Sequence, residues 1–151
     1  MLSPYVEGFS VSSPFEAKLV REVIGSSGIV HIVTPGYKLN EMKDIASVAD
    51  YISFNSLSQW ERFSGWASEC ASCGLRINPQ LSFVEDKRYN PCRKHSKLGV
   101  PLSKLASISN NGSGVLRGLK GILFHTYFES TIINHLLKTG KHLDAHIPRI
   151  L

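Results

Sequence analysis

The sequence lacks the features that would assign it to a membrane, secreted or disulfide-rich class. No apolar run approaches the roughly 20 residues that a membrane-spanning helix requires, so we expect no membrane association. The first residues, MLSPYVEGF, have neither a basic start nor an apolar signal core, which favours a cytoplasmic protein. Only three cysteines occur, and this odd number argues against a disulfide framework.

Charge of one sign is also too weak and too dispersed to identify a nucleic-acid-binding protein. The formal net charge is +5, but the basic residues gather only at Arg93, Lys94, His95 and Lys97. A solvated loop explains this cluster better than a nucleic-acid patch does. With 151 residues, 42% of them hydrophobic and 19% charged, the chain has the composition of one globular domain.

Short strand patterns alternate with helical patterns that carry start signals. Ser13-Pro-Phe-Glu16 and Ser58-Gln-Trp-Glu61 have the form of capping boxes, and Asn40 is placed to cap a helix over 41–48. A last helix is predicted over 130–138, ending at Gly140. The strand patterns occupy residues 9–12, 29–33, 51–54, 74–78 and 121–124.

This alternation predicts the α/β class, with five βα units on a parallel sheet in chain order. Composition alone fits either a doubly wound sheet or part of a (β/α)8 barrel. A complete TIM-type barrel takes about 250 residues, so five units in this length would form an incomplete one. Residues 79–101 are too long for a plain connection and indicate a functional loop.

Three cysteines and a histidine suggest an alternative class, a small basic zinc-binding module for nucleic acid. Cys70 and Cys73, then Cys92 and His95, have knuckle-like spacing within each pair. However, a strand over 74–78 would separate the two pairs by roughly 15–20 Å at about 3.3 Å per residue. We therefore predict buried or idle thiols and no bound metal.

Arg76 and His125 are the residues that most suggest a binding site. Arg76 lies mid-strand among apolar neighbours, either paired with a carboxylate or fixed as a cation beside a ligand. His125 follows the last strand pattern, at the carboxyl edge where barrel sites lie. It suits stacking on a planar ligand or proton transfer, with an ordinary core histidine as the alternative. Strand direction predicts that Arg76 and His125 lie together at this edge.

Longer segments carry a resemblance to one family. They are GFSVSSPFEAKL, VHIVTPGYK, ADYISFNSLSQWERF, SCGLRINPQ, YNPC, SKLGV and FHT with Glu129. Over these segments the chain resembles the pyridoxal-phosphate (PLP) dependent carboxynorspermidine (carboxyspermidine) decarboxylases. The resemblance implies an alanine-racemase-like, fold type III barrel, a polyamine substrate, PLP as cofactor and a homodimer with shared active sites.

The same resemblance assigns roles to individual residues. His125 matches the histidine stacked on the PLP ring, and Arg76 matches a rim arginine that supports the cofactor. Lys97 matches a structural Lys/Arg-Leu-Gly turn, while Cys92 does not match the family's catalytic cysteine. The lysine that bonds PLP is expected upstream of the position of Ser3, and the glycine-rich phosphate segment is expected after Gly140.

The sequence contains neither this lysine nor this phosphate segment. We therefore predict a fragment: a partial PLP-binding barrel domain over residues 1–151, without the family's C-terminal β-domain. We assign no catalytic residue to this chain and expect it to be inactive alone as a PLP-dependent carboxy-lyase. A non-catalytic partner of an intact homologue is a third hypothesis, beside the zinc module. An upstream stretch that encodes the lysine would identify the origin of the chain.

Overall fold

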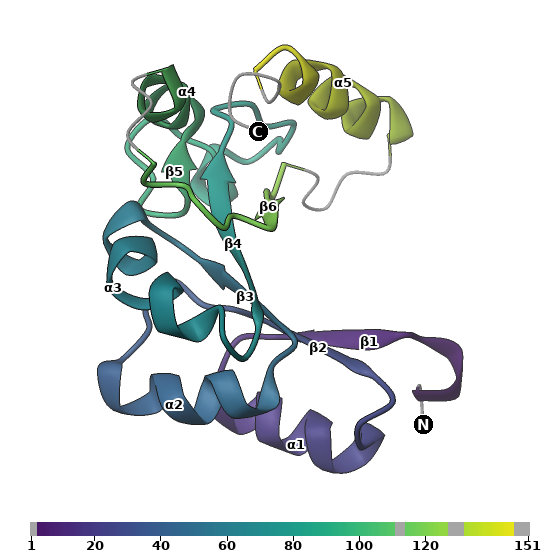
Figure 1. Cartoon of the computed structure of the whole chain (residues 1–151). Coiled ribbons are helices and arrows are strands. Elements are labelled where there is room, and N and C mark those ends of the chain that lie inside the picture. The colour runs from purple at the N-terminus through teal and green to yellow at the C-terminus, as the bar shows by residue number, and fades with distance from the viewer. Residues whose placement is uncertain (1–2, 111–113, 127–131, 147–151) are drawn as a thin grey trace. The chain divides into compact units, whose positions relative to one another are not determined.

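The computed structural model describes residues 3–110, 114–126 and 132–146 (Figure 1). The chain divides into two compact units. Unit 1 comprises Met1–Leu75 and Gly118–Ile122, and unit 2 comprises Arg76–Arg117 and Leu123–Leu151. The boundaries fall inside two strands, because β4 (Ser72–Asn78) and β6 (Gly121–Leu123) each contribute residues to both units.

Unit 1 alternates strands and helices. Its elements are η1 (Ser3–Tyr5), β1 (Gly8–Val11), α1 (Pro14–Ile24), β2 (Ile29–Val33), α2 (Leu39–Val48), β3 (Tyr51–Phe54) and α3 (Leu57–Ala67), followed by the first part of β4. Neighbouring strands from β1 to β4 pair in parallel in the order of the chain. The predicted α/β class and parallel order are therefore confirmed, and a partial barrel is consistent with them.

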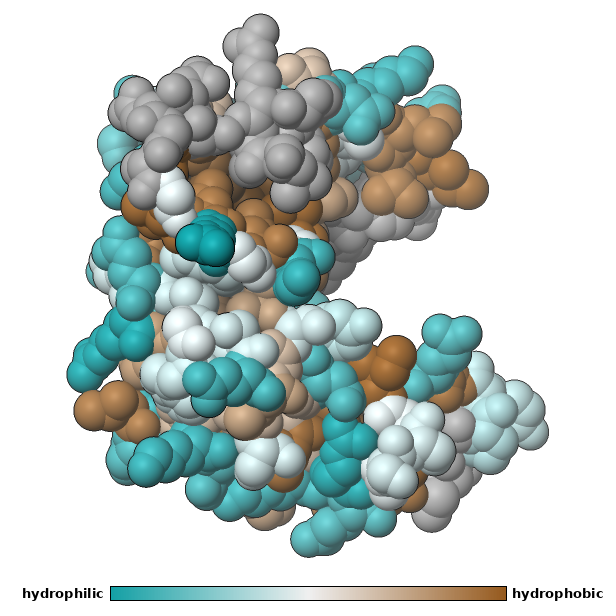
Figure 2. Space-filling model, in the orientation of Figure 1, coloured by the Kyte–Doolittle hydropathy of each residue, from teal (hydrophilic) through white to brown (hydrophobic). Residues whose placement is uncertain are grey.

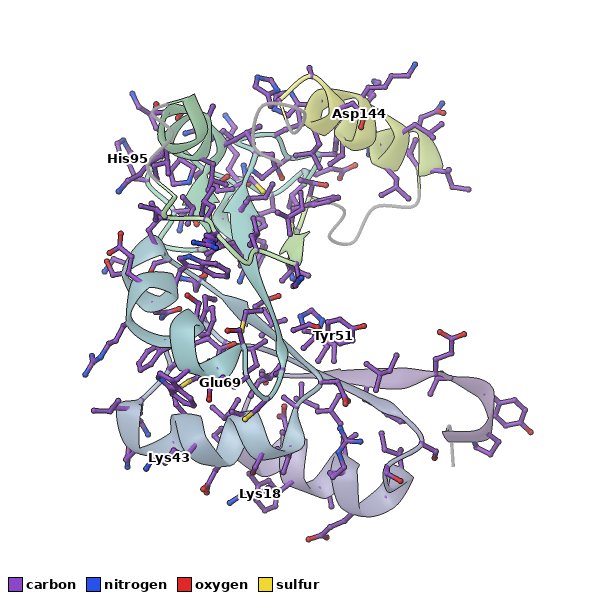
Figure 3. The ribbon with its side chains drawn as sticks, in the orientation of Figure 1. Lys18, Lys43, Tyr51, Glu69, His95 and Asp144 are labelled. Carbon is purple, nitrogen blue, oxygen red and sulfur yellow. The ribbon has the colours of Figure 1, made fainter. Side chains whose placement is uncertain are left out.

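One face of the unit 1 strands is apolar and fully buried. Ile32, Ile52 and Phe54 are completely shielded from solvent, and the helices cover them with Met42 and Trp60. The charged side chains Lys18 and Lys43 project from α1 and α2 away from the sheet (Figure 3). The alternating burial of β2, the buried apolar residues of β3 and one apolar stripe on each helix thus produce the helix-covered side of the sheet.

Helix starts in unit 1 follow capping chemistry, with two corrections to the sequence predictions. The Ser13 hydroxyl accepts from the Glu16 backbone N–H at 3.2 Å, as a capping box requires. The second box is shifted by two residues: α3 is capped by Ser56, whose Oγ accepts from the backbone N–H of Gln59 at 3.3 Å. Asn40 does not cap α2, which begins at Leu39 without a side-chain cap.

Unit 2 contains the rest of β4, η2 (Lys87–Tyr89), β5 (Val100–Pro101), α4 (Leu102–Asn110), the end of β6 and α5 (Ile133–Asp144). β5 pairs in parallel with the carboxyl end of β4, through Ile77↔Val100. The sequence predicted neither β5 nor α4, and α5 continues four residues beyond its predicted stop at Gly140. Apolar residues Ile133, Leu136 and Leu137 are exposed on α5, where Figure 2 shows a brown patch.

β6 confirms the predicted neighbour of β4, while β5, which the sequence did not predict, also pairs with β4. β6 pairs with β4 and lies off the path that continues to β5. A glycine on each strand permits the close approach, because a Cβ on Gly74 would lie 2.8 Å from the Gly121 carbonyl oxygen. The backbone N–H of Lys120 also donates to the Cys73 carbonyl at 2.9 Å.

Candidate functional site

Arg76 lies in the C-terminal half of β4, in unit 2, and is only 9% exposed. Burial lowers the pKa of its guanidinium, while the neighbouring Cys92 acts in the opposite direction. No ion pair within the described residues includes Arg76. The sequence offered two interpretations of Arg76, a partner of a carboxylate or a fixed cation beside a ligand. The described residues do not provide the carboxylate partner that the first interpretation requires.

His125 follows β6 by two residues, in a segment without regular secondary structure. His125 is exposed, yet partial desolvation lowers the pKa of its imidazole, and the positive charge of Arg76 lowers it further. The influence of the Arg76 charge on His125 is consistent with the predicted proximity of the two residues. At neutral pH this environment favours the uncharged imidazole over a second cation.

Cys92 is the third member of this cluster and comes from the loop between β4 and β5. Its thiol is 5% exposed and donates a hydrogen bond to the backbone carbonyl of His125 at 3.0 Å. Burial raises the pKa of the thiol to about 11, although Arg76 opposes this shift. The thiol is therefore protonated at neutral pH and is a poor nucleophile and metal ligand.

The loop that carries Cys92 is fastened to the end of β4. The Asn78 side chain is buried, donates to the Arg93 carbonyl at 3.2 Å and accepts from the Gln80 backbone N–H at 2.9 Å. The Cys92 backbone N–H donates to the Asn90 side chain at 2.8 Å. Residues 79–99 are thus held against the strand end that carries Arg76.

The Lys97-Leu-Gly turn closes this loop, and its glycine has a steric reason. Gly99 has a φ of +81°, and a Cβ there would lie 2.7 Å from the Ile77 carbonyl carbon of β4. Any larger residue would strain the turn and push it away from the strand. This explains why the LGV sequence returns the chain to β5 beside Ile77.

Helix α5 adjoins the same loop and the segment after His125. The hydroxyls of Thr126 and Thr139 share a hydrogen bond of 2.9 Å, and both side chains are buried. The His142 ring nitrogen lies 3.1 Å from the Pro79 carbonyl oxygen. These contacts connect α5 to the segment after His125 and to the start of the loop after β4. Glu129, which the sequence comparison included, lies outside the described residues.

The zinc alternative has no support in the structure. Within the described residues, no group of three or more His, Cys, Asp or Glu side chains is arranged to hold a metal ion. Cys70 is exposed, Cys73 is buried in unit 1 and Cys92 is buried in unit 2. His95 is exposed on its loop (Figure 3).

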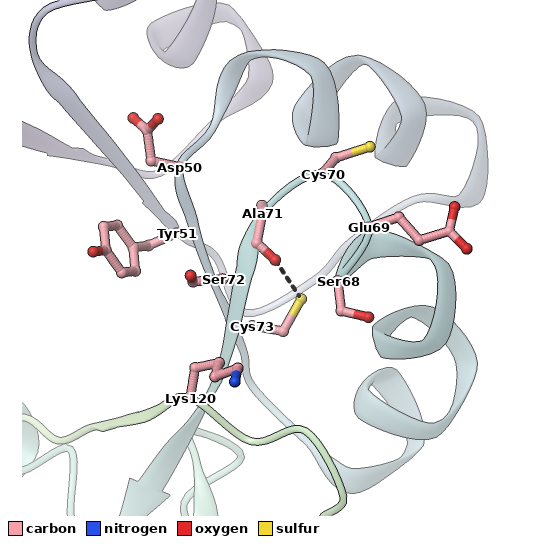
Figure 4. Close-up of a pocket in the computed structure, with 9 residues that line it drawn as sticks. All are labelled: Asp50, Tyr51, Ser68, Glu69, Cys70, Ala71, Ser72, Cys73 and Lys120. Carbon is pink, nitrogen blue, oxygen red and sulfur yellow. Dashed lines mark hydrogen bonds between the residues drawn. The ribbon is translucent and has the colours of Figure 1, made fainter.

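One cavity lies at a different place, at the amino edge of β3 and β4 in unit 1 (Figure 4). It measures about 390 Å³, and Tyr51, Glu69, Cys70 and Lys120 are among its lining residues. Sites in barrel enzymes lie at the opposite, carboxyl edge. Its size therefore does not make it the better candidate.

A second cavity in unit 1, of about 180 Å³, contains a histidine and a serine in contact. His31 Nε2 lies 2.8 Å from Ser53 Oγ, and burial lowers the pKa of His31. No carboxylate lines the cavity, so the pair lacks the third group that orients a catalytic histidine. It serves as a cross-strand hydrogen bond on the polar face of the sheet.

Sequence reasoning missed two contributors to the cluster in unit 2. Cys92 was predicted to be a buried or idle thiol, and its burial is confirmed, but its role as a donor to His125 depends on a contact across 33 positions. Asn78 was treated as the end of a strand. Its position immediately before Pro79 was the available signal, because an asparagine there can form a turn with the backbone that follows.

Comparison with known proteins identifies related decarboxylases. The chain is 38% identical over 82% of its length to carboxyaminopropylagmatine decarboxylase from Synechocystis sp.. It is 30% identical over 87% of its length to carboxynorspermidine/carboxyspermidine decarboxylase from Campylobacter jejuni. The chain spans only 30% and 32% of these two relatives. No family model matches the chain.

Solved structures support the fold. Carboxynorspermidine decarboxylase from Campylobacter jejuni, solved with norspermidine, superposes over 98% of this chain with a TM-score of 0.76 and 24% identity. Diaminopimelate decarboxylase from Helicobacter pylori superposes over 97% with a TM-score of 0.67. The chain covers 35% and 40% of these structures. No described helix is long and apolar enough to cross a membrane. The chain is thus similar to carboxy(nor)spermidine decarboxylases and spans about one third of their length.

Proposed function

We propose that this chain forms the part of a PLP-dependent decarboxylase barrel that contacts the cofactor ring. The substrate class is a polyamine that carries a carboxyl group, such as carboxynorspermidine or carboxyspermidine. The similarity to decarboxylases of such compounds supports this class. A homodimer and a cytoplasmic location remain predictions from the resemblance.

The observation that carries the proposal is that unit 2 holds a buried Arg76 whose charge acts on His125. A buried arginine needs a counter-charge, and no ion pair in the described part of the chain supplies one. A phosphorylated pyridine derivative is anionic and planar, so its charge suits Arg76 and its ring suits the face of His125. The residues present therefore fit this part of the cofactor.

PLP, when bound, supplies the electron sink that stabilises the carbanion left by loss of carbon dioxide. The task of His125 is to hold its neutral imidazole against the planar ring, since a lowered pKa keeps a competing positive charge away. Arg76 provides a fixed positive charge in a poorly solvated position, where it stabilises negative charge more strongly than in water. Asn78 and Cys92 keep the surrounding loop closed around both residues.

A chimeric enzyme tests the proposal. The matching segment of the Campylobacter jejuni decarboxylase is replaced by this chain, and carbon dioxide release is measured with carboxynorspermidine, carboxyspermidine and carboxyaminopropylagmatine. The third substrate is included because the Synechocystis relative is named for it. We expect the chimera to be active on at least one substrate.

Variants of the chimera then assign the residues. His125→Ala and Arg76→Gln should each lower kcat/KM by at least tenfold, which corresponds to about 1.4 kcal/mol of lost transition-state stabilisation. His95→Ala, in an exposed part of the same unit, is the control and should have little effect. An active chimera that tolerates His125→Ala would contradict the assigned role.

A further inference from the structure

We infer that Cys92 is a positioning residue, whose thiol holds His125 in place beside Arg76 by a hydrogen bond to the His125 backbone carbonyl. The contact is direct, with 3.0 Å between Cys92 Sγ and the carbonyl oxygen. It joins residues that are 33 positions apart in the sequence. The inference rests on the proposed function in one respect: the role of His125 as a contact of the cofactor ring comes from there.

The donor side of this bond is rigidly placed. Hydrogen bonds at Asn90 and Arg93 flank Cys92, and the latter reaches Asn78 at the end of β4. The thiol is 5% exposed, so water does not compete for its proton. Through these hydrogen bonds, Cys92 connects the segment that carries His125 to the end of β4, the strand that also carries Arg76.

Among the described residues, the acceptor side of the bond has few other supports. His125 lies outside β6, and the neighbouring Thr126 is tied to Thr139 of α5 at 2.9 Å. That bond fastens the segment to α5, whereas the Cys92 bond fastens it to the loop after β4. Loss of the Cys92 bond would leave the Thr126 contact and allow the His125 backbone to move relative to Arg76.

The chemistry of the thiol agrees with a donor and disfavours a reactive cysteine. Burial raises the pKa of Cys92 to about 11, so the proton needed for the hydrogen bond is present at neutral pH. A thiolate would instead repel the carbonyl oxygen. Serine, with a hydroxyl in the same position, keeps a donor, and alanine removes it.

The test is an NMR titration of the His125 imidazole in the full chain without cofactor, in wild type, Cys92→Ala and Cys92→Ser. In Cys92→Ala we expect the pKa of His125 to rise toward its ordinary value, because the ring moves from the partial desolvation and the Arg76 charge that lower it. Cys92→Ser should restore the wild-type titration. Cys73→Ala, which removes another buried thiol in unit 1, is the control and should leave His125 unchanged.

A measurement on wild-type protein covers the case in which Cys92→Ala does not fold. The S–H stretching band of Cys92, assigned by its loss in Cys92→Ser, should lie at lower frequency than that of the exposed Cys70. The inference is overturned by a Cys92 band without this shift, by an unchanged His125 titration in Cys92→Ala, or by equal shifts in Cys92→Ala and Cys92→Ser. All three readouts are independent of PLP, so they stand apart from any failure of the proposed function.

The link to cofactor binding is measured separately. If His125 holds the ring, Cys92→Ala should weaken binding of pyridoxine 5′-phosphate by about two- to tenfold, the usual worth of one hydrogen bond. A displaced His125 titration with unchanged affinity would uphold the positioning role of Cys92 and count against the proposed role of His125.

Discussion

Units 1 and 2 are held together by different kinds of interaction. Most of the largest fully buried side chains belong to unit 1, among them Trp60, Phe54 and Phe63. Phe54 lies at the centre of this aromatic group, with ring centroids 5.4–6.2 Å from Tyr37, Trp60 and Phe63. Unit 2 has a smaller apolar core and relies on side-chain hydrogen bonds at Asn78, Cys92 and Thr126.

The residues that contribute most to stability therefore lie in unit 1, whereas the candidate functional residues lie in unit 2. Close-packed aromatic and aliphatic residues provide most of the free energy that stabilises unit 1. Unit 2 keeps the guanidinium of Arg76 buried, an arrangement that desolvation opposes, and hydrogen bonds hold the loop and the segment of the exposed His125 around it. The residues with candidate functions accordingly lie where the apolar core is small.

The largest expected effect concerns whether the site in unit 2 is sufficient for catalysis. We predict that the isolated 151-residue chain does not decarboxylate carboxynorspermidine, because it spans about a third of the related enzymes. Purified chain is incubated with PLP and substrate, and carbon dioxide release is followed. Turnover, or borohydride trapping of PLP on one particular lysine such as Lys97, would show that the site is complete.

The next effect compares a phenylalanine from each unit. Phe54→Ala in unit 1 should lower the free energy of unfolding by about 3–5 kcal/mol, since the side chain is fully buried. Phe83→Ala in unit 2 should cost about 1 kcal/mol, because Phe83 is half-buried and its main described ring contact is with His135. Urea unfolding measured by circular dichroism gives both values. Phe15→Ala, which changes an exposed side chain of α1, is the control. Equal losses in the two units would remove the distinction.

A smaller effect is expected at the main polar contact of unit 1. The Arg21 guanidinium donates to the carbonyls of Val48 and Gly28 at 2.8–3.0 Å and to Asp50 at 2.6 Å. Arg21→Lys cannot keep this set and should cost about 1–3 kcal/mol in urea unfolding. Lys18→Ala removes an exposed ion pair and should cost less than about 1 kcal/mol. A harmless Arg21→Lys would mean that packing alone stabilises unit 1.

The smallest effect is a pH dependence to which both units contribute. Burial lowers the folded-state pKa of His31 in unit 1 and of His125 in unit 2, so the unfolded chain binds more protons near these pKa values. Stability should therefore fall as pH drops from about 6.5, the ordinary histidine value, toward the lowered ones. His31→Gln and His125→Gln should each flatten this fall when urea unfolding is repeated across pH. A variant with an unchanged pH profile would show that its histidine is not perturbed.

The sequence predicted those parts of the fold that local patterns determine. The bounds of β2 and β3 were correct, since their apolar, β-branched segments need no distant partner to be recognised. β5 was missed because a two-residue strand ending in proline exists only through its pairing with β4. α5 continues through Gly140 because buried Thr139 and Leu143 on either side hold the helix.

The candidate site shows the same division. Arg76 and His125 could be selected from their strand positions, and their proximity followed from the direction of parallel strands. The Cys92 bond could not be predicted, because it joins a loop to a segment without regular structure across 33 positions. The pairing of β6 with β4 was predicted, but the close approach of Gly74 and Gly121 that permits it was not.

The central claim, that Arg76 and His125 bind the cofactor ring, is tested most directly by NMR titration with pyridoxine 5′-phosphate. This compound has an alcohol in place of the PLP aldehyde and so does not react with lysines. We predict saturable shifts at the Arg76 guanidinium and the His125 imidazole, and loss of the Arg76 shifts in His125→Ala. Shifts confined to the cavity near Lys120 in unit 1, or Arg76 shifts that persist in His125→Ala, would contradict the claim.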